Sequence, residues 1–401
     1  MEKTPKNILG ALSTGPIQRY IREHESDDVK QLVLKHKAIL GIPAAHLFEQ
    51  IAARKKAREK LPLYYNTEGI IFPPLLNFEQ SSSEATAVYK SDIVKGVLHG
   101  KTAADLTGGF GVDSYFLSRN LQTVDYVEPE EFLLEIARHN HQLLGASNIR
   151  YHLSTAEEFL RQNGESFDAV YLDPSRRDVS KRKIHSLAES RPDVLKLKHQ
   201  IFGKTKFLLV KASPLFDLHE GIKQLGQIRK VYVISVANEC KEVLFLSERD
   251  FAGTPVIDAI NLTGTAHSFE FTFPEERDVQ VLYSDPLKYL YEPNASILKA
   301  GAFKSVARRF GLMKLQANTH LYTANDLIPE FPGRKFLIEK LVKPDEVKKY
   351  FPEKRGNITV RNYPLTAEQL KKKTGLKDGG EKFLIGFSGA TQKFLAVAAR
   401  V

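Results

Sequence analysis

The sequence has little of what marks several classes of protein. Its 401 residues contain one cysteine, Cys240, which excludes an internal disulfide framework and is typical of a reducing compartment. No cysteines or histidines have the spacing of a zinc site, so no metal is expected. The longest apolar runs, such as residues 207–210, have the length of a strand and not of a membrane span. The first residues lack the apolar core of a signal peptide, and we expect a cytoplasmic protein without a membrane partner.

Acidic residues are scarce in the last third of the chain. Residues 281–401 hold 22 Lys and Arg against 11 Asp and Glu, whereas residues 1–280 hold 36 against 37. The whole formal charge of +10 therefore lies in the C-terminal part. A basic part attached to a near-neutral body predicts a polyanionic partner such as RNA or DNA, while a solvated lysine-rich surface stays open as the alternative.

From residue 101 onward, strand-like and helix-like segments alternate. Strands are expected near residues 102–106, 123–128, 148–153, 167–173, 205–211, 229–236 and 240–246. Helices are expected near residues 112–120, 130–144, 155–162, 190–201 and 215–225. Connections of helix length predict an α/β fold whose sheet is mostly parallel, and the short connection before the last strand predicts a terminal antiparallel hairpin.

The two ends of the chain have other patterns. Residues 5 to about 60 are expected to be helical, with one helix that includes Val29 and Leu40 and ends at Gly41. A second helix over 44–60 ends at Pro62. Beyond Arg249, short strands and helices predict small α+β modules.

The most informative segment runs from Thr102 to Glu128. An apolar run ends in Asp105, a turn with Thr107, Gly108, Gly109 and Gly111 precedes a helix, and a second apolar run ends in Glu128. Such a β-α-β unit holds the nucleoside part of a cofactor. Asp105 would repel a pyrophosphate but suits the ammonium group of S-adenosylmethionine, and the carboxylate of Glu128 can accept hydrogen bonds from both ribose hydroxyls.

Two further segments are candidates for cofactor contacts. Backbone groups around Thr155 and Ala156, after the third strand, are expected to meet the adenine. Gln80, Ser82 and Ser83 would supply neutral hydrogen bonds to the methionine end of the cofactor, with a plain helix cap as an equal alternative.

The fourth strand ends in Asp173 and Pro174. Methyl transfer from a sulfonium needs mainly alignment and a nucleophile with an available lone pair. A carboxylate and a main-chain carbonyl at this turn can accept both N–H bonds of an exocyclic amine, so Asp173 is the predicted catalytic residue. Arg176 and Arg177 follow where enzymes that methylate base amines carry proline and an aromatic residue, and with the cations at 181–183 they predict a phosphate contact; a solvated loop is the alternative.

Together, DLTGGFGVDS (105–114), VEPE (127–130) and YLDPSRR (171–177) resemble bacterial class I S-adenosylmethionine-dependent methyltransferases that carry a THUMP-like C-terminal domain. Residues 360–387 resemble the end of that domain, and residues from about 255 to 320 resemble a small ferredoxin-like module. The resemblance implies a seven-stranded Rossmann-like core. The implied domains are an N-terminal helical region (1–70), the methyltransferase domain (71–250), the ferredoxin-like module (251–323) and the THUMP-like domain (324–401).

The leading hypothesis is a methyltransferase that uses S-adenosylmethionine to modify a purine nitrogen in structured RNA, tRNA or rRNA. One alternative is methylation of a small molecule or a protein. The other is a noncatalytic RNA-binding protein with a vestigial cofactor fold. A dinucleotide oxidoreductase is disfavoured because the turn lacks the GxGxxG register.

Overall fold

The computed structural model describes residues 5–27, 37–176, 187–262 and 267–401, which divide into two compact units. The first unit comprises residues 1–231 and 242–253, and the second comprises residues 232–241 and 254–401. The chain crosses from the first unit to the second within one strand and returns within the next. Among the described residues, no helix has both the length and the apolar character that crossing a bilayer requires.

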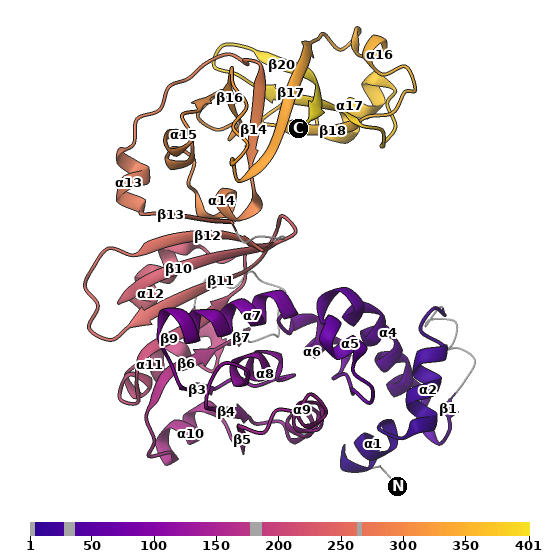
Figure 1. Cartoon of the computed structure of the whole chain (residues 1–401), viewed down its shortest axis with the longest axis vertical. Coiled ribbons are helices and arrows are strands. Elements are labelled where there is room, and N and C mark those ends of the chain that lie inside the picture. Colours follow the sequence, from indigo (N-terminus) through magenta and orange to yellow (C-terminus); the bar gives the residue numbers. More distant parts are fainter. Residues whose placement is uncertain (1–4, 28–36, 177–186, 263–266) are drawn as a thin grey trace. The chain divides into compact units, whose positions relative to one another are not determined.

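The first unit alternates strands and helices along most of its length (Figure 1). Its helices are α1 (Pro5–Leu12), α2 (Gly15–Glu23), α4 (Ala44–Lys60), α5 (Pro62–Asn66), α6 (Leu75–Gln80), α7 (Glu84–Asp92), the π-helical turn Ile93–Val97, α8 (Val112–Ser118), α9 (Glu131–Leu143), α10 (Ala156–Gln162), the 3₁₀ turn Leu187–Glu189, α11 (Val194–Phe202) and α12 (Leu218–Leu225). Its strands are β1 (Ala38–Ile39), β2 (Ile42–Pro43), β3 (Thr102–Asp105), β4 (Thr123–Glu128), β5 (Ile149–Leu153), β6 (Phe167–Leu172), β7 (Ser175–Arg176), β8 (Ser190–Arg191) and β9 (Thr205–Ala212), with parts of β10 (Ile228–Val236) and β11 (Glu239–Glu248).

The large sheet has the order β13-β12-β10-β11-β9-β6-β3-β4-β5. The pairs β4–β5, β3–β4, β3–β6 and β6–β9 are parallel, and β11 runs antiparallel to β9. These findings confirm the predicted α/β fold with a mostly parallel sheet and the hairpin of β10 and β11. The hairpin does not end the sheet, because β12 and β13 follow beyond β10 and give nine strands in place of the implied seven. Strand order reverses between β3 and β6, and ligands of such sheets bind at the carboxyl ends of the strands beside that reversal.

The N-terminal helices share a hydrophobic core with the first β-α turn of the sheet. Phe110, in the glycine-rich turn, is 3% exposed, and its ring lies 5.4 Å from that of Tyr64 and 6.2 Å from that of Phe78. Val112 and Ile136 belong to the same core. The turn that follows β3 therefore packs against residues of the N-terminal helices, which precede the sheet in sequence.

Two helix predictions are wrong in part. Of the helix predicted to include Val29 and Leu40, residues 28–36 lie outside the described residues, and Ala38–Ile39 form β1, paired with β2. Leu40 (φ +49°) and Gly41 (φ +77°) reverse the chain between these strands, which is the backbone of a two-residue hairpin and not of a helix end.

The helix predicted over 190–201 begins only at Val194. Ser190–Arg191 form β8, because Pro192 disfavours helical backbone in the residue before it. Asp193 then starts α11, its carboxylate accepting a hydrogen bond of 3.3 Å from the Lys196 N–H.

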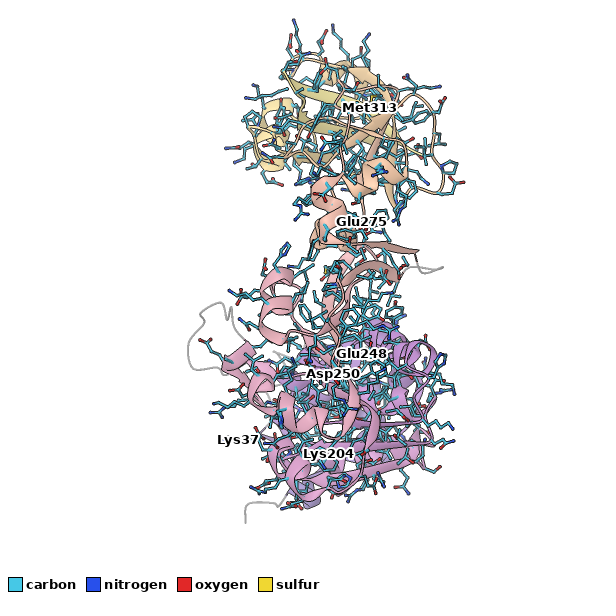
Figure 2. All side chains as sticks on the ribbon, turned by 90° about the vertical axis from the view of Figure 1, so that its left-hand side faces the viewer. Lys37, Lys204, Glu248, Asp250, Glu275 and Met313 are labelled. Carbon is cyan, nitrogen blue, oxygen red and sulfur yellow. The ribbon has the colours of Figure 1, made fainter. Side chains whose placement is uncertain are left out.

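The second unit contains a mostly antiparallel sheet of order β15-β16-β14-β17-β20-β19-β18, in which only β18 and β19 are recorded as a parallel pair. Its elements are β12 (Val256–Leu262), β13 (His267–Phe271), α13 (Phe273–Asp278), β14 (Tyr289–Pro293), α14 (Ala295–Ala300), α15 (Ser305–Arg309), β15 (Met313–Lys314), β16 (Tyr322–Ala324), β17 (Gly333–Leu341), α16 (Val347–Tyr350), β18 (Asn357–Arg361), α17 (Ala367–Thr374), β19 (Lys382–Ser388) and β20 (Lys393–Arg400). Local signals set its helix starts: Thr272 caps α13 in a reciprocal pair with Glu275, one of the side chains labelled in Figure 2.

Candidate functional site

The glycine-rich turn after β3 meets the acid at the end of β4. Glu128, 7% exposed, accepts a hydrogen bond of 2.8 Å from the Gly109 N–H and another of 2.9 Å from the Glu130 N–H. Among the described residues no cation pairs with this carboxylate, so its remaining lone pairs are available. Burial raises the pKa of Glu128, although both N–H groups oppose the shift.

The three glycines of the turn are needed for different reasons. A Cβ on Gly108 would lie 2.3 Å from the ring of Tyr126, and one on Gly111 (φ +82°) would lie 2.6 Å from Nε2 of His141. Only Gly109 (φ +53°) has open space, since a Cβ there would meet nothing closer than 3.8 Å. Close approach of a ligand to the backbone is therefore available over Gly109, while Gly108 and Gly111 are required by the packing of the fold itself.

Asp105 lies beneath this turn and is 1% exposed. One carboxylate oxygen accepts a hydrogen bond of 2.6 Å from the Ser114 hydroxyl, and the other accepts one of 3.1 Å from the Thr107 N–H. Burial raises the pKa of Asp105 to about 7, with repulsion from Asp113 and Asp173 adding to the shift. Within the described parts of the chain, this buried carboxyl group forms no ion pair with a cation.

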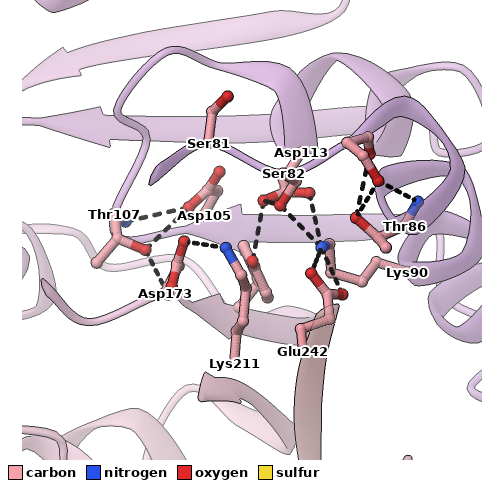
Figure 3. A network of polar contacts seen from close by, with 12 residues as sticks. Ser81, Ser82, Thr86, Lys90, Asp105, Thr107, Asp113, Asp173, Lys211 and Glu242 are labelled. Atoms are coloured by element: carbon pink, nitrogen blue, oxygen red, sulfur yellow. Dashed lines mark hydrogen bonds and ion pairs between the residues drawn. The ribbon is translucent and has the colours of Figure 1, made fainter. Parts of the chain in front are cut away.

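Asp173 follows β6 and lies beside the same turn (Figure 3). Its N–H donates a hydrogen bond of 2.7 Å to the hydroxyl of Thr107, which ties the ends of β3 and β6 together. Its side chain is 33% exposed, and Oδ2 lies 2.5 Å from Nζ of Lys211 on β9. The structure thus brings Asp105, Thr107 and Asp173 together, as the sequence predicted, and adds a lysine.

A buried ionic network next to Asp173 was missed by sequence reasoning. Nζ of Lys90, on α7, donates hydrogen bonds of 2.8 and 3.0 Å to the two carboxylate oxygens of Glu242, on β11. The same Nζ lies 3.2 Å from Oδ1 of Asp113, on α8. Lys90 is 1% exposed and Glu242 is 2% exposed. Of these residues, Lys211 has a local signal, as a charged residue that directly follows the apolar run 207–210 within β9. Lys90 and Glu242 are separated by 152 residues, and no local pattern pairs them.

Ion pairing within the network shifts the pKa values of Asp113 and Lys211. Burial by itself would raise the pKa of Asp113, but Lys90 and Lys211 lower it below the ordinary value. Burial would likewise lower the pKa of Lys211, but the carboxylates of Asp173, Glu242 and Asp113 raise it above the ordinary value. Lys211 therefore remains an ammonium ion at every physiological pH.

The serines before α7 have structural partners. Ser82 is buried, donates a hydrogen bond of 2.8 Å to Asp113 and accepts one of 2.9 Å from Lys90. Ser83 is the N-cap of α7, as the helix-cap alternative predicted, and Gln80 is the exposed last residue of α6.

The other predicted residues lie at the ends of β5 and β6. Thr155 caps α10 in a reciprocal pair with Glu158, and Ala156 is its first, buried residue. Pro174 directly precedes β7, and Arg176 in β7 pairs with Ser190 in β8. Arg177 and the cations at 181–183 lie outside the described residues. In the parts of the chain that are described, no three His, Cys, Asp or Glu residues are grouped so as to hold a metal ion.

Comparison with known proteins gives matches to both parts of the chain. A family model described as a ferredoxin-like domain matches residues 289–332, and one described as THUMP domain-like matches residues 333–400. The crystal structure described as "putative methyltransferase from Porphyromonas gingivalis W83" is 31% identical in sequence and has a TM-score of 0.84. That similarity covers 100% of this chain and 99% of the other.

Curated relatives match a smaller part. Ribosomal RNA large subunit methyltransferase I of Erwinia tasmaniensis is 24% identical over 38% of this chain. An uncharacterized RNA methyltransferase of Mycoplasma mobile is 26% identical over 31% of this chain. The chain spans 38% and 34% of the length of these two relatives.

The packing of the turn predicts a large effect of Gly111→Ala. The substitution adds left-handed strain and a contact with the buried ring of His141. Gly145→Ala is the matched control, since Gly145 also has a positive φ (+79°) but nothing within 4 Å of an added Cβ. We expect Gly145→Ala to lower the free energy of unfolding by about 1 kcal/mol, and Gly111→Ala to lower it by roughly 1–3 kcal/mol more. Equal losses in urea unfolding would contradict the assigned packing.

The raised pKa of Asp105 predicts a pH-dependent effect of Asp105→Asn. Between pH 4 and 7 the folded protein holds a proton on Asp105 that the unfolded chain has lost, so this group makes the fold less stable as pH rises. The free energy of unfolding of Asp105→Asn, relative to that of the parent, should therefore rise across this range. The rise is at most about 1.4 kcal/mol for each pH unit, and it should level off above pH 7.

Asp168→Asn serves as the control in the same urea unfolding series. The pKa of Asp168 is lowered, since hydrogen bonds from Lys101 and Thr102 outweigh its partial burial. Its effect on stability should be constant between pH 5 and 8. A constant difference for Asp105→Asn as well would contradict the raised pKa.

Proposed function

Since this chain belongs to the methyltransferase family represented by the Porphyromonas gingivalis structure and ends in ferredoxin-like and THUMP-like domains, we propose that it transfers a methyl group from S-adenosylmethionine to RNA. The observation that carries the proposal is the contact between Glu128 and Gly109. It places a carboxylate with free lone pairs beside the one open glycine of the turn, where strand order reverses.

The residues present fit the methyl donor. Glu128 would accept hydrogen bonds from the ribose hydroxyls, and Gly109 leaves room for the nucleoside to approach the backbone. The donor's ammonium group would supply a cation for Asp105, directly or through water, and would favour the ionised form of this carboxyl. Thr155 and Ala156 are proposed to meet the adenine through backbone groups. When bound, S-adenosylmethionine supplies a methyl group on a positively charged sulfur.

Asp173 is the residue proposed to contact the acceptor. Its carboxylate is one-third exposed, and among the described residues Oδ1 has no partner. The hydrogen bond from its N–H to Thr107 fixes it relative to the donor side of the site. Positioning of this kind is the main requirement of a displacement at a methyl carbon.

Three observations support RNA as the acceptor. The printed names of the curated relatives refer to ribosomal RNA or RNA methylation. The THUMP domain-like match covers residues 333–400. The excess of positive charge lies in residues 281–401, as phosphate binding requires. The purine nitrogen remains a prediction from the sequence, and Arg176 and Arg177 remain proposed phosphate contacts.

Substitution of Glu128 tests the cofactor site. Glu128→Ala should weaken binding of S-adenosylmethionine about 10- to 100-fold, because hydrogen bonds to a charged group contribute about 1.5–3 kcal/mol. Titration calorimetry measures this directly. Glu130→Ala is the matched control: it is an exposed glutamate two residues further on, whose side chain makes no hydrogen bond to the turn. Equal affinities of the two variants would remove Glu128 from the site.

Substitution of Asp173 tests the transfer point. Asp173→Ala should retain affinity for S-adenosylmethionine and lose methyl transfer to total cellular RNA, with Asp173→Asn as a variant of equal size. The assay measures tritium transferred from labelled S-adenosylmethionine into RNA. Undiminished transfer by both variants would remove Asp173 from the mechanism. Absence of RNA binding by the parent protein at low salt would favour a small-molecule or protein acceptor instead.

A further inference from the structure

The ion pair of Lys211 and Asp173 offers both kinds of hydrogen-bonding group to a substrate. An ammonium has three N–H donors, and among the described residues Nζ of Lys211 makes its one hydrogen bond to Oδ2 of Asp173. Two donors of Lys211 are therefore free, and so is the acceptor Oδ1 of Asp173. The Lys211 side chain is 12% exposed, and its Nζ contacts Asp173 at the carboxyl edge of the sheet (Figure 3).

We propose that the acceptor of the methyl group is a ribose 2′-hydroxyl of RNA, held jointly by Lys211 and Asp173. The inference rests on the proposed function and names its acceptor atom. It replaces the purine nitrogen that the sequence alone predicted.

The first argument is hydrogen-bond complementarity. A 2′-hydroxyl is both donor and acceptor, so its proton can meet Oδ1 of Asp173 while its oxygen accepts an N–H of Lys211. The exocyclic amine of a base has its lone pair delocalised into the ring and acts as a donor only. Such an amine would leave the free donors of Lys211 without a partner in a partly desolvated site.

The second argument is the sign of the charge that develops during transfer. An amine nitrogen becomes positive as it takes up a methyl group, and a neighbouring ammonium opposes that change. A hydroxyl oxygen loses its proton and gains negative character, which a neighbouring ammonium stabilises. Lys211 therefore favours an oxygen acceptor over a nitrogen acceptor.

The surroundings of Lys211 preserve this charge. Glu242 and Asp113 act on it from β11 and α8, and Asp173 contacts it directly; together these carboxylates raise its pKa above the ordinary value even though burial lowers it. Lys90 pairs with Glu242 and Asp113 and makes no hydrogen bond to Asp173. Lys90 thus balances Glu242 and Asp113, and of the two lysines in this cluster Lys211 is the one that contacts Asp173.

The step balances with these groups. A lone pair of the hydroxyl oxygen forms the bond to the methyl carbon, and the carbon–sulfur bond breaks with its electron pair remaining on sulfur, which becomes neutral. The O–H bond breaks, and its proton passes to Oδ1 of Asp173 and from there to water.

Alkaline hydrolysis of methylated RNA separates the two acceptors. Total RNA from cells that lack this gene is incubated with the full-length protein and tritiated S-adenosylmethionine, and is then hydrolysed in alkali. A methylated 2′-oxygen cannot attack the adjacent phosphate, so the label should appear in alkali-resistant dinucleotides. Label in mononucleotides would show base methylation and overturn this inference while leaving the proposed function intact. No label in RNA would overturn both.

Lysine variants test the role of Lys211. Lys211→Met should lower kcat 100-fold or more with cofactor affinity unchanged by calorimetry, and Lys211→Arg should recover part of the loss because it restores the cation. Lys206→Met is the control, since it removes a cation of the same strand, β9, that pairs with Glu248 and not with Asp173. It should lower kcat less than 10-fold. Equal losses of kcat in the two Met variants would remove Lys211 from the acceptor site, and the hydrolysis result decides the acceptor even where a variant fails to fold.

Discussion

The pairing of buried charges at the carboxyl edge of the sheet is the constraint on which the site depends. Removing an ion from water costs several kcal/mol, and the cost is recovered only where an opposite charge and further hydrogen bonds are in place. Lys90 forms an ion pair with Glu242, and Lys211 forms one with Asp173. Each pair joins elements that are far apart in sequence. If α7, β6, β9 and β11 were not all in place, a buried charge would be left without its partner.

Packing imposes a second constraint on the same edge. The turn after β3 is fixed from one side by Phe110, which lies in the core of the N-terminal helices, and from the other by Tyr126, whose hydroxyl donates a hydrogen bond of 2.6 Å to the Gly109 carbonyl. The site is therefore built in advance of any ligand: its turn is fixed by aromatic side chains and its acidic residues by backbone N–H groups or cations. Among the described residues, the open face of Gly109, the remaining lone pairs of Glu128, Oδ1 of Asp173 and two N–H donors of Lys211 are left for ligands.

The sequence predicts those features of the structure that depend on residues close together in the chain. Apolar runs, the glycine turn and strand-terminal acids predicted the sheet and placed Asp105 and Glu128 correctly at one edge. The lysine network was not predicted because Lys90 on α7 and Glu242 on β11 are 152 residues apart and become neighbours only in the folded protein. The helix predicted over 190–201 begins at Val194 because Pro192 disfavours helical backbone in the residue before it. The packing role of Gly108 and Gly111 was not predicted, because the rings that they contact come from other elements.

A crystal structure of the full chain with S-adenosylhomocysteine, the demethylated form of the donor, tests the central claim most directly. The account predicts ribose hydroxyls within hydrogen-bonding distance of Glu128, the nucleoside over Gly109, and the sulfur directed toward Asp173 and Lys211. A ligand bound away from this edge, or one whose sulfur points away from the Asp173–Lys211 pair, would contradict it.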